Sequence, residues 1–214
     1  RPSRRETASR SCGTEKLSSK MASIPTTLKS SETCARLCTS TSTKVGWTAR
    51  AGDRSPDGRY LAVTRSASLT DFSIYIQDEN GAEEPFVNTP GRHSCPRFHP
   101  SGEYIVYMSN ESGRWEVYVK PFHRPGRRMQ VSLEGGSDPV WARDGSELFY
   151  RTGDTVLSVR VETDNGIRFG APEAMFNFEF GGKISPFIAS FDVHPDGKRF
   201  VMSDIVAGDR GATG

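Results

Sequence analysis

The sequence predicts an all-β fold in which one unit of four short strands is repeated along the chain. Three observations predict this fold: a turn motif that recurs at a nearly fixed period, a strand-like stretch after every copy of the motif, and almost no helical periodicity. The four copies of the motif are Arg54–Gly58 (RSPDG), Phe98–Gly102 (FHPSG), Ala142–Gly145 (ARDG) and Val193–Gly197 (VHPDG). Their last glycines are 44, 43 and 52 residues apart, which indicates a late insertion near residues 177–188.

The stretches around the turns have the composition of strands. They are rich in β-branched and aromatic residues and are too short for typical helices. One stretch follows each turn, at Arg59–Thr64, Glu103–Met108, Ser146–Arg151 and Lys198–Ser203. A second stretch follows in three units, at Phe72–Gln77, Trp115–Lys120 and Thr155–Arg160, and a third precedes the last three turns, at Ser94–Phe98, Asp138–Trp141 and Ala189–Val193. A weaker fourth stretch, as at Arg128–Ser132, closes the unit.

Four strands in about 43 residues match the size of one β-propeller blade. The turn chemistry agrees, because proline presets φ and glycine accepts a positive φ, so that Asp-Gly between apolar stretches favours a hairpin. A β-sandwich would not explain why the same residue types return in the same order at a fixed period. We therefore expect a partial β-propeller of about four four-stranded blades over residues 51–206.

The segments on either side of the repeat differ from it. Residues 1–50 are rich in Arg, Lys, Ser and Thr and lack both apolar alternation and Asp-Gly turns. We expect this segment to be disordered or not native to the protein, although a basic, Ser-rich stretch is also typical of a transit peptide or a nucleic-acid-binding tail. Residues 207–214 are expected to be a truncated tail.

One run of motifs resembles a known repeat. The pattern of an aromatic residue, Pro-Asp-Gly, an apolar strand and then Ser-Asn-x-x-Gly-x-Trp-Glu-Val-Tyr-Val is similar to the TolB-like propeller repeat, which is itself WD-repeat-like. Residues 109–151 are most similar to C-terminal propellers of bacterial Ser/Thr protein kinases and related sensors. The resemblance covers about residues 54–206 and implies a propeller of six or more blades when complete. It also favours a periplasmic or other extracytoplasmic location.

Composition argues against several classes of protein. The 28 basic and 26 acidic residues leave a net charge of only +2, which is no signature of nucleic-acid or membrane binding. The longest apolar runs fall short of the roughly 18 residues that a membrane span needs. The four cysteines, Cys12, Cys34, Cys38 and Cys95, lack the paired spacing of zinc ligands. We expect no cofactor, no metal, no nucleic-acid partner and no direct membrane insertion. Composition and cysteine spacing do not indicate a cellular compartment.

No motif in the sequence indicates catalysis. The Gly-x-Ser-x-Gly elbow, the phosphate-binding loop and the kinase signatures are all missing. His99 and His194 occupy the same position of the repeat, which indicates a role in blade packing or in the turn rather than in chemistry. Three further aromatic residues fall at strand positions and are expected in the core between blades: Trp115, Tyr118 and Trp141. We therefore expect no enzyme activity from these residues.

A binding surface is expected where loops gather. In a propeller the loops between second and third strands share one face with the connections between blades. The loops are expected near 66–71, 109–114 and 151–154, and the connections near 88–94, 132–138 and 181–190. Their polar residues are candidates for contact with a protein or peptide: Arg92, His93, Asn110, Arg114, Glu134, Asp138 and Arg151.

Two functions from different classes fit these features. The first is a non-catalytic binding or scaffold module for a protein, peptide or small ligand, as the sensory or accessory domain of a larger bacterial signalling protein that carries kinase and membrane-spanning segments elsewhere. The alternative is the propeller of a prolyl-oligopeptidase-type hydrolase, which admits substrate to a separate catalytic domain. The neighbouring coding sequence separates them. A third possibility is that this piece alone has no function, because an open propeller exposes strand edges.

Overall fold

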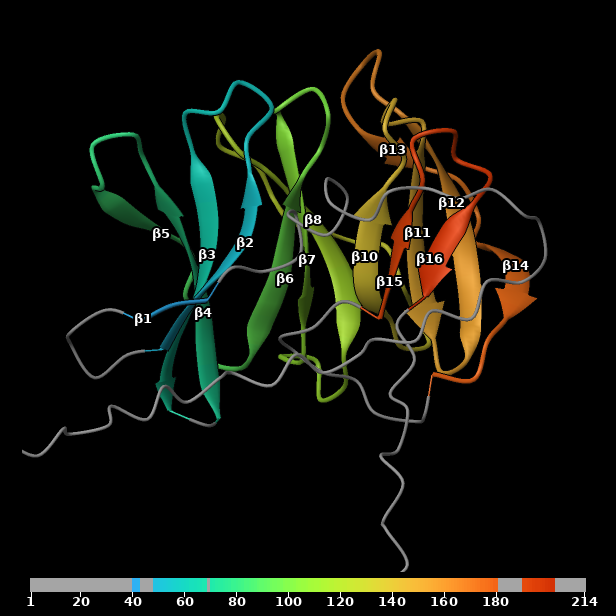
Figure 1. The fold of residues 1–214 in the computed structure, drawn as a ribbon, viewed down its shortest axis with the longest axis horizontal. Helices are drawn as coiled ribbons and strands as arrows, with labels where there is room; N and C mark the ends of the chain where they lie inside the picture. Colours follow the sequence, from blue (N-terminus) through green and yellow to red (C-terminus); the bar gives the residue numbers. More distant parts are fainter. Residues whose placement is uncertain (1–39, 43–47, 69, 181–189, 203–214) are drawn as a thin grey trace, which may run out of the picture.

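The described residues form strands and turns only. A computed structural model describes residues 40–42, 48–68, 70–180 and 190–202, and within these ranges it has strands β1 to β16 and no helix. The strands form antiparallel sheets that follow one another along the chain (Figure 1). The described part of the chain therefore holds no helix of the length and apolar character that crossing a membrane requires. The predicted all-β fold is confirmed.

The first sheet has the strand order β1-β2-β3-β4-β5. Its strands are β1 (Ser40–Ser42), β2 (Thr48–Arg54), β3 (Leu61–Ser68), β4 (Asp71–Gln77) and β5 (Glu83–Val87). In β4 every second side chain is buried, namely Phe72, Ile74 and Ile76. Because successive side chains of a strand point to opposite faces, this alternation buries one face of the sheet more deeply than the other.

The second sheet has the order β6-β7-β8-β9 and occupies the middle of the fold. Its strands are β6 (His93–Phe98), β7 (Tyr104–Ser109), β8 (Glu116–Pro121) and β9 (Met129–Gln130). All side chains of β7 are buried. A strand with a sheet on each side loses its polar face, which is why the sequence of β7 reads as a continuous apolar run (YIVYMS) rather than as an alternation.

The third sheet is built around β12. It comprises β10 (Ser137–Trp141), β11 (Glu147–Thr152), β12 (Thr155–Glu162), β13 (Arg168–Phe169) and β14 (Glu173–Asn177). The outer edge of β12 pairs with β13 at one end and with β14 at the other, so the fourth strand of this sheet is divided into two pieces. The pair β15 (Phe191–Val193) and β16 (Phe200–Met202) follows beyond it (Figure 1).

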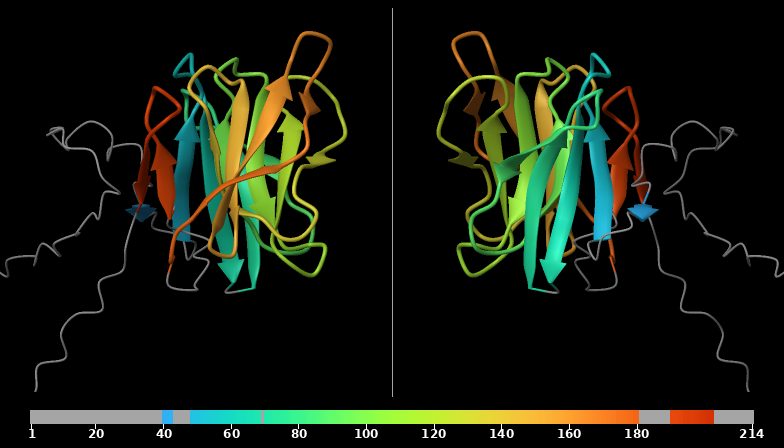
Figure 2. Two further views of the ribbon diagram at one scale, coloured as in Figure 1. Left: turned by 90° about the vertical axis from the view of Figure 1, so that its right-hand side faces the viewer. Right: turned by 90° about the vertical axis from the view of Figure 1, so that its left-hand side faces the viewer.

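The sheets pack as the blades of a propeller do. One strand of each sheet lies next to one strand of the following sheet, since β2 contacts β6, β6 contacts β10, and β10 contacts β15. Trp141 Nε1 donates a hydrogen bond to Arg97 O at 3.2 Å, which joins the first strands of the second and third sheets. Figure 2 shows the sheets face to face, with their strands aligned along roughly the same axis and neighbouring strands pointing in opposite directions.

Apolar cores fill the space between the sheets. The largest lies between the second and third sheets and includes Tyr104, Val106, Val117, Trp141, Leu148 and Val159. Each such side chain, when fully buried, contributes roughly 1.5–3 kcal/mol. Trp141 and Tyr118 are both buried between blades, as predicted, whereas Trp115 is half-buried. The predicted partial propeller, with four repeated units, is confirmed, although the described residues show only two strands of the fourth.

The repeated turns have nearly identical geometry. The glycines Gly58, Gly102, Gly145 and Gly197 have φ angles of 77°, 75°, 76° and 68°. Each of their N–H groups donates to the carbonyl three residues earlier, at 2.8–3.0 Å. A positive φ in all four copies explains why glycine recurs at the end of the motif. Each predicted strand also overlaps an observed one, with ends shifted by up to four residues.

Some sequence predictions fall outside the described residues. The disorder expected for 1–50 concerns mainly residues 1–39 and 43–47, and the tail expected at 207–214 is likewise outside. Two described strands nevertheless use this range, because β1 lies within it and β2 begins at Thr48. The first sheet thus starts before residue 51. Most of the predicted insertion at 177–188 also lies outside, apart from residues 177–180.

Candidate functional site

The inter-sheet connections and the loops between second and third strands meet at one end of the strands. This end is the lower one in Figure 1. We call it the connection face and define it by residues 88–92, 110–115, 131–136 and 153–154. Main-chain hydrogen bonds join connection to loop: Asn110 N donates to Arg92 O at 3.1 Å, and Gly136 N donates to Trp115 O at 2.8 Å. The predicted loop arrangement is therefore present for these two connections, whereas residues 181–189 of the third predicted connection lie outside the described residues.

Three of the predicted site residues fix the first connection against its neighbouring loop. Arg92 N donates to Asn110 Oδ1 at 2.7 Å, which complements the bond from Asn110 N. His93 is fully buried, and its Nε2 lies 2.8 Å from Thr89 O. The Arg92 guanidinium lies 5.6 Å from the centre of the Phe72 ring. These contacts give Arg92, His93 and Asn110 a role in ordering the loops.

Arg114 belongs to a second network, centred on a buried carboxylate that sequence reasoning did not single out. Arg114 Nε donates to Glu116 Oε1 at 2.6 Å, and the side chains are 58% and 1% exposed respectively. Glu116 also accepts from Gly135 N at 3.1 Å and from the Ser132 hydroxyl. This network holds the connection at 131–136. Glu134, the fifth predicted residue, is exposed within that connection.

Asp138 and Arg151 form a buried ion pair. Arg151 Nε donates to Asp138 Oδ2 at 2.6 Å, and the side chains are only 2% and 0% exposed. Asp138 also accepts from Ser190 Oγ at 2.9 Å, which links β10 to the residue before β15. Its φ of 53° places it at the bulge where β10 and β11 lose register. The structure thus brings these two predicted residues together inside the fold.

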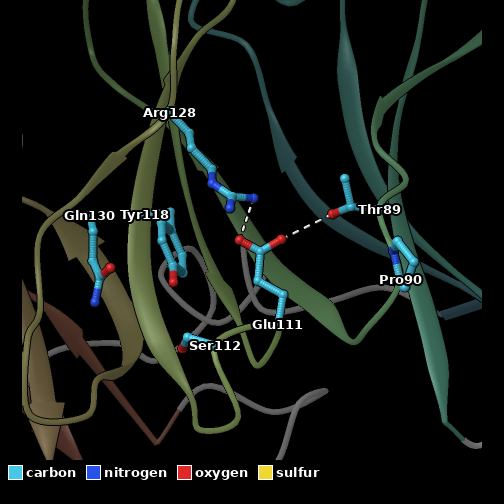
Figure 3. Close-up of a pocket in the computed structure, with 7 residues that line it drawn as sticks. All are labelled: Thr89, Pro90, Glu111, Ser112, Tyr118, Arg128 and Gln130. Atoms are coloured by element: carbon cyan, nitrogen blue, oxygen red, sulfur yellow. Dashed lines mark hydrogen bonds and ion pairs between the residues drawn. The ribbon is translucent and has the colours of Figure 1, made fainter.

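An open hollow of about 520 Å³ lies beside the first connection. We call it the Glu111 hollow, and its lining is shown in Figure 3: Thr89, Pro90, Glu111, Ser112, Tyr118, Arg128 and Gln130. The carboxylate of Glu111 lies between Arg128, with which it forms an ion pair, and Thr89, whose hydroxyl donates to it at 3.0 Å. The lining therefore combines both charges, hydroxyl groups, an amide and an aromatic ring.

The Arg128 guanidinium is fixed by its ion pair with Glu111 but remains accessible to solvent. Its side chain is 43% exposed, against 12% for Glu111, and it lies 5.2 Å from the centre of the Tyr118 ring. Burial lowers the pKa of Arg128, but the hydrogen bond and the charge of Glu111 outweigh burial and hold that pKa above its ordinary value. A fixed, charged guanidinium with a planar array of donors suits a carboxylate or carbonyl acceptor.

None of the seven residues predicted to contact a protein or peptide lines the Glu111 hollow. Thr89, Pro90, Glu111 and Ser112 do lie within the loop ranges that topology indicated, 88–94 and 109–114. Gln130 lies in β9, the closing strand of the second sheet, and Arg128 directly precedes that strand; neither was predicted as a binding residue. The missing signal was three-dimensional, because the connection, the β7–β8 loop and the start of β9 meet only when β6 to β9 pair as one sheet.

Among the described residues, no group of three or more His, Cys, Asp or Glu side chains is placed to hold a metal ion. His99 has the packing and turn roles that the repeat predicted. Its Nδ1 lies 2.8 Å from Ser101 Oγ in its own turn, and its Nε2 lies 3.1 Å from Gly145 O in the turn of the next sheet. His194 bonds within its own turn, to Asp196 and Arg199.

Comparison with known proteins identifies the fold. No protein-family profile matches the sequence, and no curated protein does either. A solved structure from Agrobacterium tumefaciens, provisionally assigned as TolB, matches with a TM-score of 0.56 and 18% identity, over 79% of this chain and 70% of that chain. TolB from Acinetobacter baumannii matches with a TM-score of 0.45 and 17% identity, over 71% of this chain and 42% of that chain.

The sheets and the loop-built connection face define a β-propeller with a polar surface at one end. Its fold is that of the TolB-like propellers, as the sequence motifs predicted.

Proposed function

We propose that this chain is a non-catalytic binding module that recognises a polar segment of a protein or peptide at the connection face. The proposal extends to its setting: an accessory or sensory domain of a larger bacterial signalling protein, in an extracytoplasmic compartment. The TolB-like fold and the resemblance of residues 109–151 to kinase-linked propellers support this setting.

The observation that carries the proposal is the Glu111 hollow. A peptide can present a backbone carbonyl or a carboxylate to Arg128, while Ser112 and Gln130 supply further hydrogen-bonding groups. Tyr118 gives an apolar wall with low conformational entropy. Because hydrogen bonds and ion pairs already fix the loops around the hollow, binding would order few groups, which lowers its entropic cost.

The test is selection from a random peptide library on the immobilised chain, followed by calorimetry with the selected peptides. Arg128→Gln is expected to weaken binding by about tenfold or more, because a hydrogen bond to a charged group is lost. The matched control is Arg143→Gln, an exposed arginine in a turn at the other end of the strands, and it should bind like the wild type. An equal loss of peptide affinity in both variants, or an unchanged affinity in both, would reject this site.

Two further measurements examine the wider proposal. Peptidase or nucleotidase activity that co-purifies with the chain would contradict a non-catalytic role. The neighbouring coding sequence tests the setting: an upstream kinase domain with a membrane span supports the signalling proposal, whereas a downstream Gly-x-Ser-x-Gly domain supports the hydrolase alternative.

A further inference from the structure

A second hollow, of about 570 Å³, lies between the first and second sheets at the end of the strands away from the connection face. Its lining comes from the β2–β3 turn, the β4–β5 turn, β5, and the segment after β8. We call it the aromatic groove. We infer that the aromatic groove binds a basic side chain, lysine or arginine, presented by a peptide segment of another protein.

Aromatic rings form one wall of the groove. Tyr60, Phe86, Phe122 and His123 all line it. The Phe122 ring is central, with its centre 5.1 Å from that of Tyr60 and 6.3 Å from that of Phe86, both in edge-to-face arrangements. The Tyr60 and Phe86 rings already attract cations of this chain: Arg59 lies 5.7 Å from the centre of Tyr60, and Lys120 Nζ lies 4.5 Å from that of Phe86.

Carboxylates supply the other wall. Asp78, Glu79 and Glu84 line the groove, against the single guanidinium of Arg59. Glu79 and Glu84 are exposed. The charge of the residues that line the groove is therefore negative, and a cation that enters meets aromatic side chains and carboxylates together, which is the combination that aromatic sites for cations use.

The acidic wall is built before a ligand arrives. Asp78 Oδ1 accepts from Asn80 N at 2.9 Å and from Ala82 N at 2.8 Å, so this carboxylate closes the β4–β5 turn. Asp78 N also donates to Ala82 O at 2.9 Å. The turn consequently holds Glu79 at its tip. A preformed site has less conformational entropy to lose on binding.

The experiment is an NMR titration of the isotope-labelled full chain with two tripeptides, acetyl-Gly-Arg-Gly-amide and its citrulline analogue. Citrulline keeps the shape of arginine but has no charge. We expect the arginine peptide to shift the amide signals of residues 78–84 and 122–123 in a saturable way. Each ion pair at an exposed site changes affinity by up to about fivefold, so the citrulline peptide should bind several-fold more weakly.

Variants locate the interaction. The double variant Glu79→Gln/Glu84→Gln should bind the arginine peptide several-fold more weakly than the wild type. It should remain folded, because both side chains are exposed. Glu173→Gln, which neutralises an exposed carboxylate on β14 outside the groove, should leave its affinity unchanged. Equal affinity for both tripeptides, or an unchanged affinity in the double variant, would overturn the inference. Shifts confined to the Glu111 hollow would overturn it too, while leaving the proposed function intact.

Discussion

At the scale of single residues, substitution within the Asp138–Arg151 pair is expected to reduce the free energy of unfolding most. Both side chains are almost fully buried and lie in contact. Arg151 also donates to Gly153 O at 3.0 Å and lies 4.6 Å from the centre of the Phe180 ring. Removing one partner of a buried ion pair leaves a charge without compensation in a poorly solvated place.

Arg151→Met is therefore expected to reduce the free energy of unfolding by about 3–5 kcal/mol. Urea denaturation monitored by tryptophan fluorescence measures the change. Arg143→Met serves as the control, because Arg143 is exposed and its replacement should change stability by less than about 0.5 kcal/mol. A similar, small effect of both substitutions would contradict the structural importance assigned to the pair.

A second residue-scale prediction concerns pH. Burial holds the pKa of His99 below its ordinary value of 6.5, although the hydrogen bond to Gly145 and the charge of Glu103 act the other way. Since the folded chain binds this proton less readily than the unfolded chain, stability is complete above about pH 6.5 and falls as the pH drops below it. His99→Gln should flatten the stability profile between about pH 7 and pH 5. Parallel profiles of variant and wild type would refute this.

At the scale of elements, the repeated turns differ in what surrounds them. All four turn glycines have a positive φ, yet only Gly145 is crowded by another sheet, whereas a methyl group on Gly102 would lie 3.8 Å from Pro56, an ordinary contact. A methyl group on Gly145 would lie 2.4 Å from His99 Nε2, whereas one on Gly58 would meet nothing within 4 Å. The same motif is thus a simple turn in the first sheet and a packing contact in the third.

This difference predicts unequal effects of the same substitution. Gly58→Ala should cost about 1 kcal/mol, from the positive φ alone. Gly145→Ala should cost about 2–4 kcal/mol, because the methyl group also displaces the buried His99 ring. Thermal or urea unfolding of the two variants provides the comparison. Equal losses would show that the turn of the third sheet does not depend on His99.

At the scale of the whole molecule, the start of the first sheet decides how much of the chain can be removed. Composition alone predicts that residues 1–50 are dispensable, but β2 begins at Thr48. Deleting 1–50 removes β1 and the pairings of Thr48 with Ser66, Ala49 with Arg65, and Arg50 with Thr64. Deleting 1–39 removes no described strand.

The longer deletion should therefore lower the free energy of unfolding by about 2 kcal/mol more than the shorter one, since a few ladder hydrogen bonds are lost. Parallel denaturation curves of the two truncated chains measure the difference. Equal stability would mean that the start of β2 contributes nothing to the first sheet.

The sequence by itself determined the repeat unit, its turns and most of its strands. These features depend on local chemistry: Gly58 and its counterparts need a positive φ, and stretches such as YIVYMS are too apolar and β-branched for a loop. The antiparallel order of β2-β3-β4, β6-β7-β8 and β10-β11-β12 follows as well, because short turns force antiparallel neighbours.

Only the tertiary structure decided which polar residues are exposed and which meet. Asp138 and Arg151 are 13 residues apart and look like loop residues, yet packing buries both as a pair. Thr89 lies in the connection before β6 and Arg128 directly before β9, and both reach Glu111 only after the strands of the second sheet have paired. A short-range pattern carries no information about contacts between sheets, since burial and proximity there depend on how whole blades pack.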